Sequence, residues 1–148
     1  MHDSKAPQAI APTLFLSDSD VASLADWSGA VAALADAYAR PTSDAMVPPR
    51  SMARGDGIWL RSLTAVSPAG GHMGCKLIAA SMRARCASYL IALFNQQTMA
   101  LSALIDGNRV TGLRTAATAV LAIDRLAPQR ALRVGVIGSG FEARGALD

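Results

Sequence analysis

The sequence predicts an α+β domain followed by the opening of an α/β domain. Segments with the apolar spacing of helices lie on either side of a region of short apolar runs that are separated by Gly, Pro and Asn turns. Near the end, an apolar run enters a glycine turn, a pattern typical of the first strand and helix of an α/β unit. The 148 residues are 51% hydrophobic, which is enough for a compact domain with a core.

The first part of the chain predicts a tail, a strand and a helix. Residues 1–12 are polar and predict a flexible tail, and residues 14–16 predict a short strand. Residues 17–20 offer several N-cap candidates. The apolar spacing from residue 21 predicts one helix that runs to about residue 40 and ends before Pro41.

The middle of the chain predicts a β-rich region. We expect an extended segment over residues 46–50 and strands over residues 58–66, 73–80, 89–94 and 101–105, with turns between them. Thr111 predicts the cap of a second helix that runs from Gly112 to about Ala127 and ends at Pro128. A last strand is expected over residues 132–137.

These elements divide the chain into four parts. We expect a tail over residues 1–12, an α+β domain over residues 13–110, a linking helix over residues 111–128 and the start of an α/β domain over residues 129–148. We find no internal repeat.

Composition argues against several function classes. The net charge of +3 and the 5% aromatic content argue against nucleic-acid binding. Cys75 and Cys86 are the only cysteines, and we expect free, buried or half-buried thiols. His2 and His72 give no metal-ligand spacing. We expect no membrane partner and a cytoplasmic location, because neither a signal peptide nor an apolar run of about 20 residues is visible.

The glycine turn predicts a dinucleotide site. Gly138 would allow the tight turn from strand to helix, Gly140 would let a pyrophosphate approach the backbone, and Ala143 would let the helix pack on the strand. An ordinary strand-to-helix turn is the alternative. The acidic residue that would bind the ribose is expected about 20 residues further on. The chain therefore leaves NAD and NADP undistinguished.

Three cations stand in unusual places. Arg114 falls in the first turn of the helix expected after Thr111, where the helix dipole opposes a cation. Lys76 interrupts an apolar strand, and Arg50 follows two prolines. Each has an ordinary alternative: a surface ion pair for Arg114, an edge-strand charge for Lys76 and a solvated side chain for Arg50. Together they favour a carboxylate site beside a nicotinamide.

Five segments of the chain match one known family in order: Pro49-Arg50, Gly74-Cys75-Lys76, the segment LIDGNRVTGLRTAA over residues 104–117, Leu126-Ala127, and Val136-Ile137-Gly138-Ser139-Gly140. In these segments the chain resembles the ornithine cyclodeaminase/mu-crystallin family. The resemblance spans residues 14–148, and Asp-Gly-x-x-x-Thr-x-x-Arg-Thr-Ala-Ala is its most specific part. It implies a substrate and dimerisation domain followed by a Rossmann domain.

The resemblance also implies roles for individual residues. Arg50, Lys76 and Arg114 would grip the substrate carboxylate, and Lys76 would be catalytic through proton transfer. The implied cofactor is NAD or NADP, with cofactor-binding residues Gly138, Ser139, Gly140, Ser88 and Thr115. The implied partners are a small amino or imino acid and a second copy of the chain, in a homodimer.

Family members are about twice as long, so the resemblance implies an N-terminal half that is inactive by itself. The reaction would be oxidative deamination with cyclisation, or imine reduction. Glu142 stands where the family usually has glutamine, and Thr98-Met99 where it often has Thr-Gly, so the substrate stays open. The alternatives are a non-catalytic ligand-binding protein like mu-crystallin, or a dimerisation module.

Overall fold

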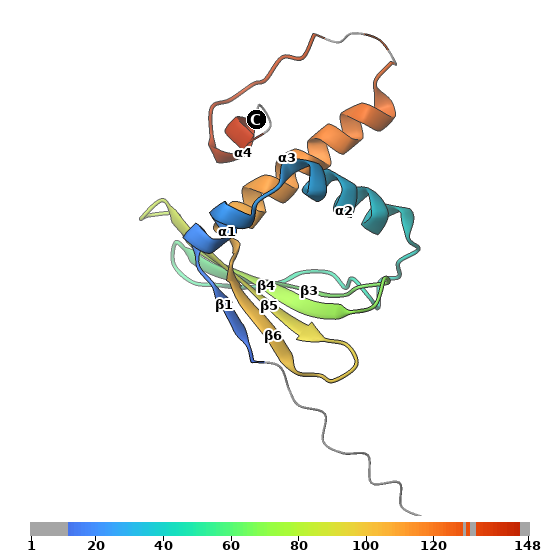
Figure 1. Cartoon of the computed structure of the whole chain (residues 1–148). Coiled ribbons are helices and arrows are strands. Elements are labelled where there is room, and N and C mark those ends of the chain that lie inside the picture. Colours follow the sequence, from blue (N-terminus) through green and yellow to red (C-terminus); the bar gives the residue numbers. More distant parts are fainter. Residues whose placement is uncertain (1–11, 129, 131–132, 146–148) are drawn as a thin grey trace, which may run out of the picture.

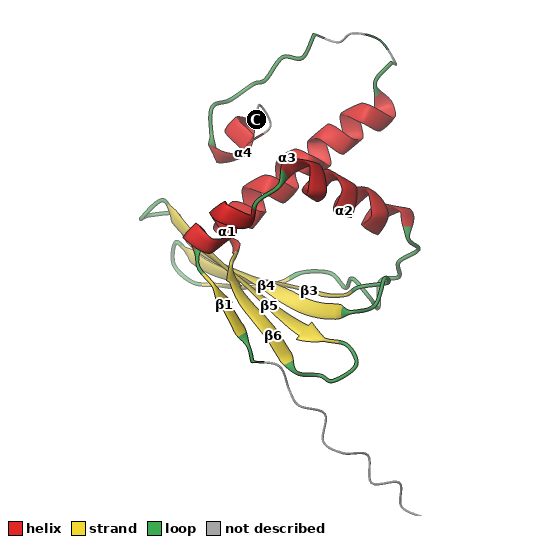
Figure 2. Ribbon diagram, in the orientation of Figure 1, coloured by secondary structure: helices red, strands yellow, loops and turns green. Residues whose placement is uncertain are grey.

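The structure of the chain is a computed structural model that describes residues 12–128, 130 and 133–145. A six-stranded sheet forms one layer, with strand order β1-β6-β5-β4-β3-β2. The helices lie together on one side of this sheet, and the opposite side carries no helix among the described residues (Figures 1 and 2). The described helices therefore cover only one of the two faces of the sheet.

The strands form an antiparallel meander with one parallel edge. They are β1 (Leu14–Leu16), β2 (Ser51–Arg54), β3 (Ile58–Val66), β4 (His72–Ser81), β5 (Cys86–Asn95) and β6 (Leu101–Asp106). Strands β2 to β6 pair antiparallel in chain order, since short turns connect them. Strand β1 pairs parallel with β6. The four strands expected in the middle region are all present, and β2 is an addition that the sequence reading missed.

The expected helix over residues 21–40 is wrong, because the structure has two helices there. Helix α1 spans Asp18–Leu24 and helix α2 spans Trp27–Ala39. Asp26 lies between them in an extended conformation, and its side chain accepts a hydrogen bond from the backbone N–H of Gly29 at 2.8 Å. This N-cap starts a new helix where apolar spacing alone suggested continuity.

The next helix begins earlier than expected. Helix α3 spans Gly107–Leu126, and its N-cap is Asp106, whose side chain accepts from the backbone N–H of Asn108. Thr111 is therefore not a cap but a buried residue inside the helix. Arg114 lies in the second turn, so the helix dipole does not explain its position, contrary to the sequence argument.

The strand expected over residues 132–137 is also not found. Residues 133–140 have no regular secondary structure, and the short helix α4 (Phe141–Gly145) follows them. A strand needs hydrogen-bonded neighbours to be stable, and no other described strand lies beside this segment. The expected residue 132 itself, like the tail over residues 1–11, falls outside the described residues.

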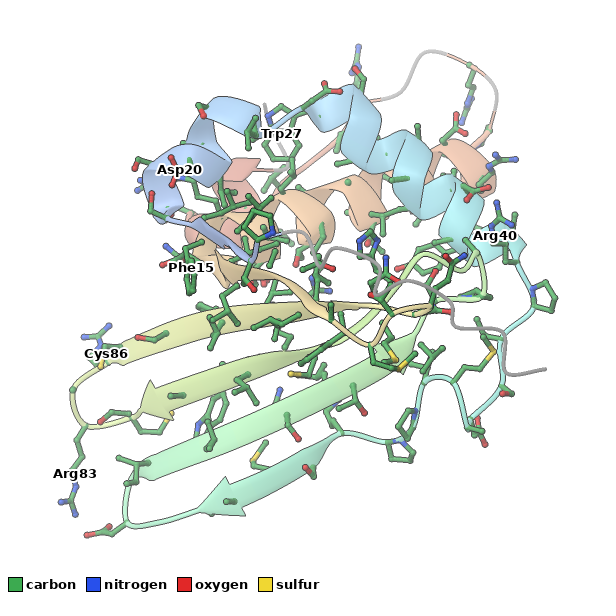
Figure 3. All side chains as sticks on the ribbon, turned by 60° about the horizontal axis from the view of Figure 1, so that its bottom comes forward. Phe15, Asp20, Trp27, Arg40, Arg83 and Cys86 are labelled. Atoms are coloured by element: carbon green, nitrogen blue, oxygen red, sulfur yellow. The ribbon has the colours of Figure 1, made fainter. Side chains whose placement is uncertain are left out.

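Small residues allow the helices to approach the sheet closely. Ala103, Ala116 and Ala117 are buried, and a Cβ added at Gly107 would meet Tyr89 and Ile91 of β5. Helix α3 therefore packs on β5, while α2 packs on α3 rather than on the strands. Trp27 and Arg40 mark the two ends of α2 in Figure 3. The side of β2, β3 and β4 that faces the helices is thus left accessible.

The side of the sheet away from the helices is apolar. Leu60 of β3, Leu90 of β5 and Phe15 of β1 all point to that side by strand alternation and are exposed. Among the described residues no large side chain is fully buried. No helix of the described part is long and apolar enough to span a bilayer.

Candidate functional site

Lys76 is the centre of the candidate site. It lies mid-strand in β4, and alternation directs its side chain to the helix side of the sheet, as it does for Ile78 and Ala80. Its Nζ donates a hydrogen bond to the Thr111 Oγ1 of α3 at 2.5 Å. The same Nζ lies 5.0 Å from the centroid of the Tyr89 ring of β5. A helix, a strand and an aromatic ring thus fix the ammonium group.

Thr111 links this lysine to the start of α3. Its side chain is 5% exposed, and its hydroxyl donates to the backbone carbonyl of Gly107 at 2.5 Å. The hydroxyl oxygen therefore accepts from Lys76 while its hydrogen is used within the helix. Because Gly107 lets α3 approach β5, the small residues at the start of the helix determine where the lysine is held.

The charge environment of Lys76 is positive. Burial lowers the pKa of Lys76, the nearby Arg114 guanidinium lowers it further, and Glu142 acts in the opposite direction. Arg114 of α3 is exposed and forms no ion pair within the described part of the chain. The two cations are therefore close enough to repel each other, and no described carboxylate forms an ion pair with either.

Arg50 lies at about the same position along the strand direction as Lys76. It precedes Ser51, which pairs with Ser62, so continued pairing would set Arg50 beside Leu63. Leu63 pairs with Lys76 on its other side. Arg50 and Lys76 are then separated by two strand spacings, roughly 10 Å at the backbone. The structure brings Lys76 and Arg114 into electrostatic range and places Arg50, which is exposed, at the margin of the same face.

Arg61 is a further cation on this face that the sequence reading missed. It lies in β3 opposite Ile78, and its guanidinium stacks over the Trp59 ring at 4.8 Å from the centroid. Its Nε is buried without a hydrogen-bond partner among the described residues. A charged residue inside an apolar strand, as at Lys76, was the signal that could have found it.

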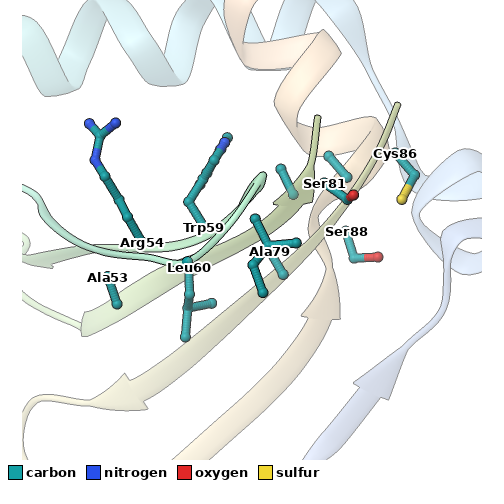
Figure 4. A pocket seen from close by; sticks show the side chains of 12 residues that line it. Ala53, Arg54, Trp59, Leu60, Ala79, Ser81, Cys86 and Ser88 are labelled. Carbon is teal, nitrogen blue, oxygen red and sulfur yellow. The ribbon is translucent and has the colours of Figure 1, made fainter. Parts of the chain in front are cut away.

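Ser88, expected beside the cofactor, lies elsewhere. It pairs with Ala79, so alternation directs it away from the helices and from Lys76. There it lines a cavity of about 630 Å³ that also involves the exposed Cys86. Figure 4 shows Arg54 and Trp59 pointing toward the helices, and Ala53 and Leu60 pointing away. The structure does not bring Ser88 together with the cation group.

Thr115 lies on α3 one turn beyond Thr111, and its hydroxyl donates to the Thr111 carbonyl at 2.7 Å. Cys75, the other thiol, is half-buried and free, as expected, whereas Cys86 is exposed rather than buried.

The glycine turn is open to an approaching ligand. Gly138 has φ of +111°, a backbone conformation that favours glycine. A Cβ added at Gly138 or Gly140 would meet no atom within 4 Å. Ser139 is held by its carbonyl, which accepts a hydrogen bond from Arg144 Nε at 3.1 Å. Helix α4 lies against α3 (Figure 1), which brings Glu142 within electrostatic range of Lys76.

The model of the ornithine cyclodeaminase/mu-crystallin family matches residues 14–147. The chain belongs to this family. The cations, the small residues of α3 and the glycine turn all lie within the matched range, so the family match covers the whole candidate site.

Individual relatives agree with this assignment. An iminosuccinate reductase from Paracoccus denitrificans is 42% identical over 53 residues, covering 36% of this chain and 17% of that protein. An archaeal alanine dehydrogenase dimer with bound NAD superposes with a TM-score of 0.80 at 26% identity. A probable ornithine cyclodeaminase from Bordetella pertussis Tohama I superposes with a TM-score of 0.81 at 25% identity.

Both superpositions cover 91% of this chain and 43% of the other chain. The chain thus spans less than half the length of these structures. Solved structures with a similar fold hold NAD or NADH, as in the archaeal alanine dehydrogenase.

Proposed function

We propose that this chain forms the substrate-binding part of an NAD(P)-dependent enzyme that acts on a small amino or imino acid. The observation that carries the proposal is the group of cations on one face of the sheet. Lys76 and Arg114 lie within electrostatic range of each other, and Glu142 is in range of Lys76, yet no described carboxylate forms an ion pair with either cation. A group of cations without an ion-pair partner is suited to the carboxylate of a ligand, because charge-assisted hydrogen bonds stabilise both sides.

The side chains have distinct tasks in this proposal. Arg114 and Arg50 bind and orient the substrate carboxylate. Lys76 contacts the same acid and transfers a proton at the substrate nitrogen, for which its lowered pKa suits it. A bound nicotinamide cofactor supplies or accepts the hydride at the substrate Cα. Reduction of an imine then adds one hydride to carbon and one proton to nitrogen, and oxidation of an amine removes them.

The open glycine turn supports a cofactor site. Gly138 can keep its positive φ, and the free space around Gly138 and Gly140 lets a pyrophosphate reach the backbone. We propose that Gly138, Ser139 and Gly140 face the cofactor, and that residues 129–148 belong to its domain. Thr115 is the further cofactor contact of the proposal, whereas Ser88 is left out because it lies on the opposite face of the sheet.

The apolar side of the sheet supports a homodimer. Leu60, Leu90 and Phe15 are 49%, 41% and 73% exposed on the face without helices. Large apolar side chains exposed on one face of a sheet are typical of an interaction site. A second copy of the chain is the partner we propose, because a symmetric pair would cover both apolar faces at once.

Binding of a simple carboxylate tests the proposed function. L-lactate is titrated into the chain while the side-chain NMR signal of Lys76 is followed, using ¹³C-labelled lysine. The chain has only one other lysine, Lys5, which serves as an internal reference. We expect saturable changes at Lys76 that Arg114→Gln abolishes. Arg125→Gln, on the same helix but in an ion pair with Asp124, is the matched control and should bind as before. An unchanged Lys76 signal would refute the proposal.

A further inference from the structure

Arg61 is a diagonal neighbour of Lys76 across the β3–β4 ladder. Leu63 pairs with Lys76, and Arg61 is two residues away from Leu63 on the same strand and the same face. Diagonal neighbours of this kind are roughly 7–8 Å apart at the backbone. The two cations therefore lie on one face of the sheet, with Arg61 one strand closer to β2 than Lys76 is.

Arg61 is held in place without being neutralised. The Trp59 ring covers one face of its guanidinium, and the Nε is buried with no hydrogen-bond partner among the described residues. A buried donor that stays unsatisfied destabilises the fold, so native structures rarely keep one without a reason. Stacking on a ring engages the face of a planar guanidinium and not the edges that carry its hydrogen-bond donors.

Most of the described acids are engaged elsewhere, although Glu142 acts on Lys76 from a distance. Three form ion pairs with other arginines, and three others accept hydrogen bonds at helix N-termini; these are Asp18, Asp36 and Asp56, and Asp20, Asp26 and Asp106. In the described part of the chain, none is an ion-pair partner of Arg61. The residue is half-buried, so bulk water does not fully solvate the group either.

From this arrangement we infer that Arg61 binds a second carboxylate of the substrate, which makes the substrate a short dicarboxylic amino or imino acid. The inference rests on the proposed function, in which Lys76 and Arg114 hold the first carboxylate. A guanidinium matches a carboxylate with two parallel hydrogen bonds, which a lysine would not provide. Since Arg61 is displaced along the sheet from Lys76, it would bind the carboxylate at the other end of the ligand.

L-malate and L-lactate test this inference, because both are stable 2-hydroxy acids and malate has one carboxylate more. The indole signal of Trp59 reports on the Arg61 end by NMR, and Trp27 of α2, the only other tryptophan, is the internal reference. We expect malate to bind about tenfold or more tightly than lactate, as one good charge-assisted contact would give. Malate should shift the Trp59 signal.

Variants at Arg61 separate the two proposals. Arg61→Met, which keeps the apolar stem, should remove the preference for malate and leave lactate binding unchanged. Arg61→Lys, which keeps the cation, should retain part of the preference and remains informative if the methionine variant does not fold. Equal binding of both acids by the unmodified chain, with Arg114→Gln still abolishing it, would overturn the Arg61 inference alone. A chain that binds neither acid refutes both proposals.

Discussion

The bond between Lys76 and Thr111 provides a sharp test of the site geometry. Thr111→Val keeps the volume and branching of the side chain but removes its oxygen. Two hydrogen bonds are lost, from Lys76 Nζ at 2.5 Å and to the Gly107 carbonyl at 2.5 Å. Because Thr111 is 5% exposed, water does not replace it at the carbonyl.

The expected loss of stability follows from these two bonds. A hydrogen bond from a charged donor contributes about 1.5–3 kcal/mol and a neutral one about 0.5–1.5 kcal/mol. Lys76 is half-buried, so a hydrogen bond to water compensates for part of the energy lost with the Lys76–Thr111 bond. We therefore expect the free energy of unfolding to fall by roughly 2 kcal/mol, which lowers the urea midpoint by about 1 M for a protein of this size.

Thr115→Val is the matched control. It removes a hydroxyl from the same helix, but that hydroxyl donates only to the Thr111 carbonyl and accepts nothing from Lys76. We expect a loss of about 1 kcal/mol or less. A double-mutant cycle of Thr111→Val with Lys76→Met then measures the interaction energy between the two side chains. Equal losses for the two threonine variants, with no coupling to Lys76, would show that the lysine is not held in this way.

Three other predictions follow from the same geometry. Arg114→Gln removes the adjacent cation and should raise the pKa of Lys76, measured by the pH titration of its NMR signal; an unchanged pKa would place Arg114 out of range. A bound carboxylate raises the pKa of Lys76, so ligand affinity should be strongest below the pKa of the free chain and fall as pH rises through it, which calorimetry at several pH values would show; a flat profile contradicts this. Gly74→Ala should lower the free energy of unfolding by about 3 kcal/mol in urea denaturation, because the new Cβ would overlap a backbone carbonyl of β5. Gly70→Ala is the control, since its Cβ would meet no atom and only the cost of its positive φ remains.

The strands could be predicted from the sequence better than the helices. Turn residues separate apolar runs clearly between residues 55 and 108, and the four strands expected there all form. Helix limits depended on which polar side chain acts as the cap. Asp26 and Asp106 both cap a helix, and neither was assigned that role, because a cap depends on one side-chain torsion rather than on a repeating pattern.

The site was predictable in kind but not in extent. Lys76 stood out because a charge interrupts an apolar strand, and the structure places it on the face next to α3. Arg61 carries the same signal, but strand register decides whether two such residues share a face. Ser88 was expected near the cofactor, yet one position along β5 directs it to the opposite side. Register between strands is a long-range property that spacing within one strand does not reveal.

The way in which each cation is held distinguishes the ion-paired arginines from the cations that we propose to bind ligand. Arg40, Arg83 and Arg109 each form an ion pair with an aspartate, which cancels their charge locally. Lys76 and Arg61 are instead held by a hydroxyl and aromatic rings, which fix position but leave the charge in place. Holding the Lys76 ammonium in this way has a cost, because burial and the neighbouring Arg114 lower its pKa. An anionic ligand relieves that cost, so the feature that weakens the free chain is also the one that favours binding.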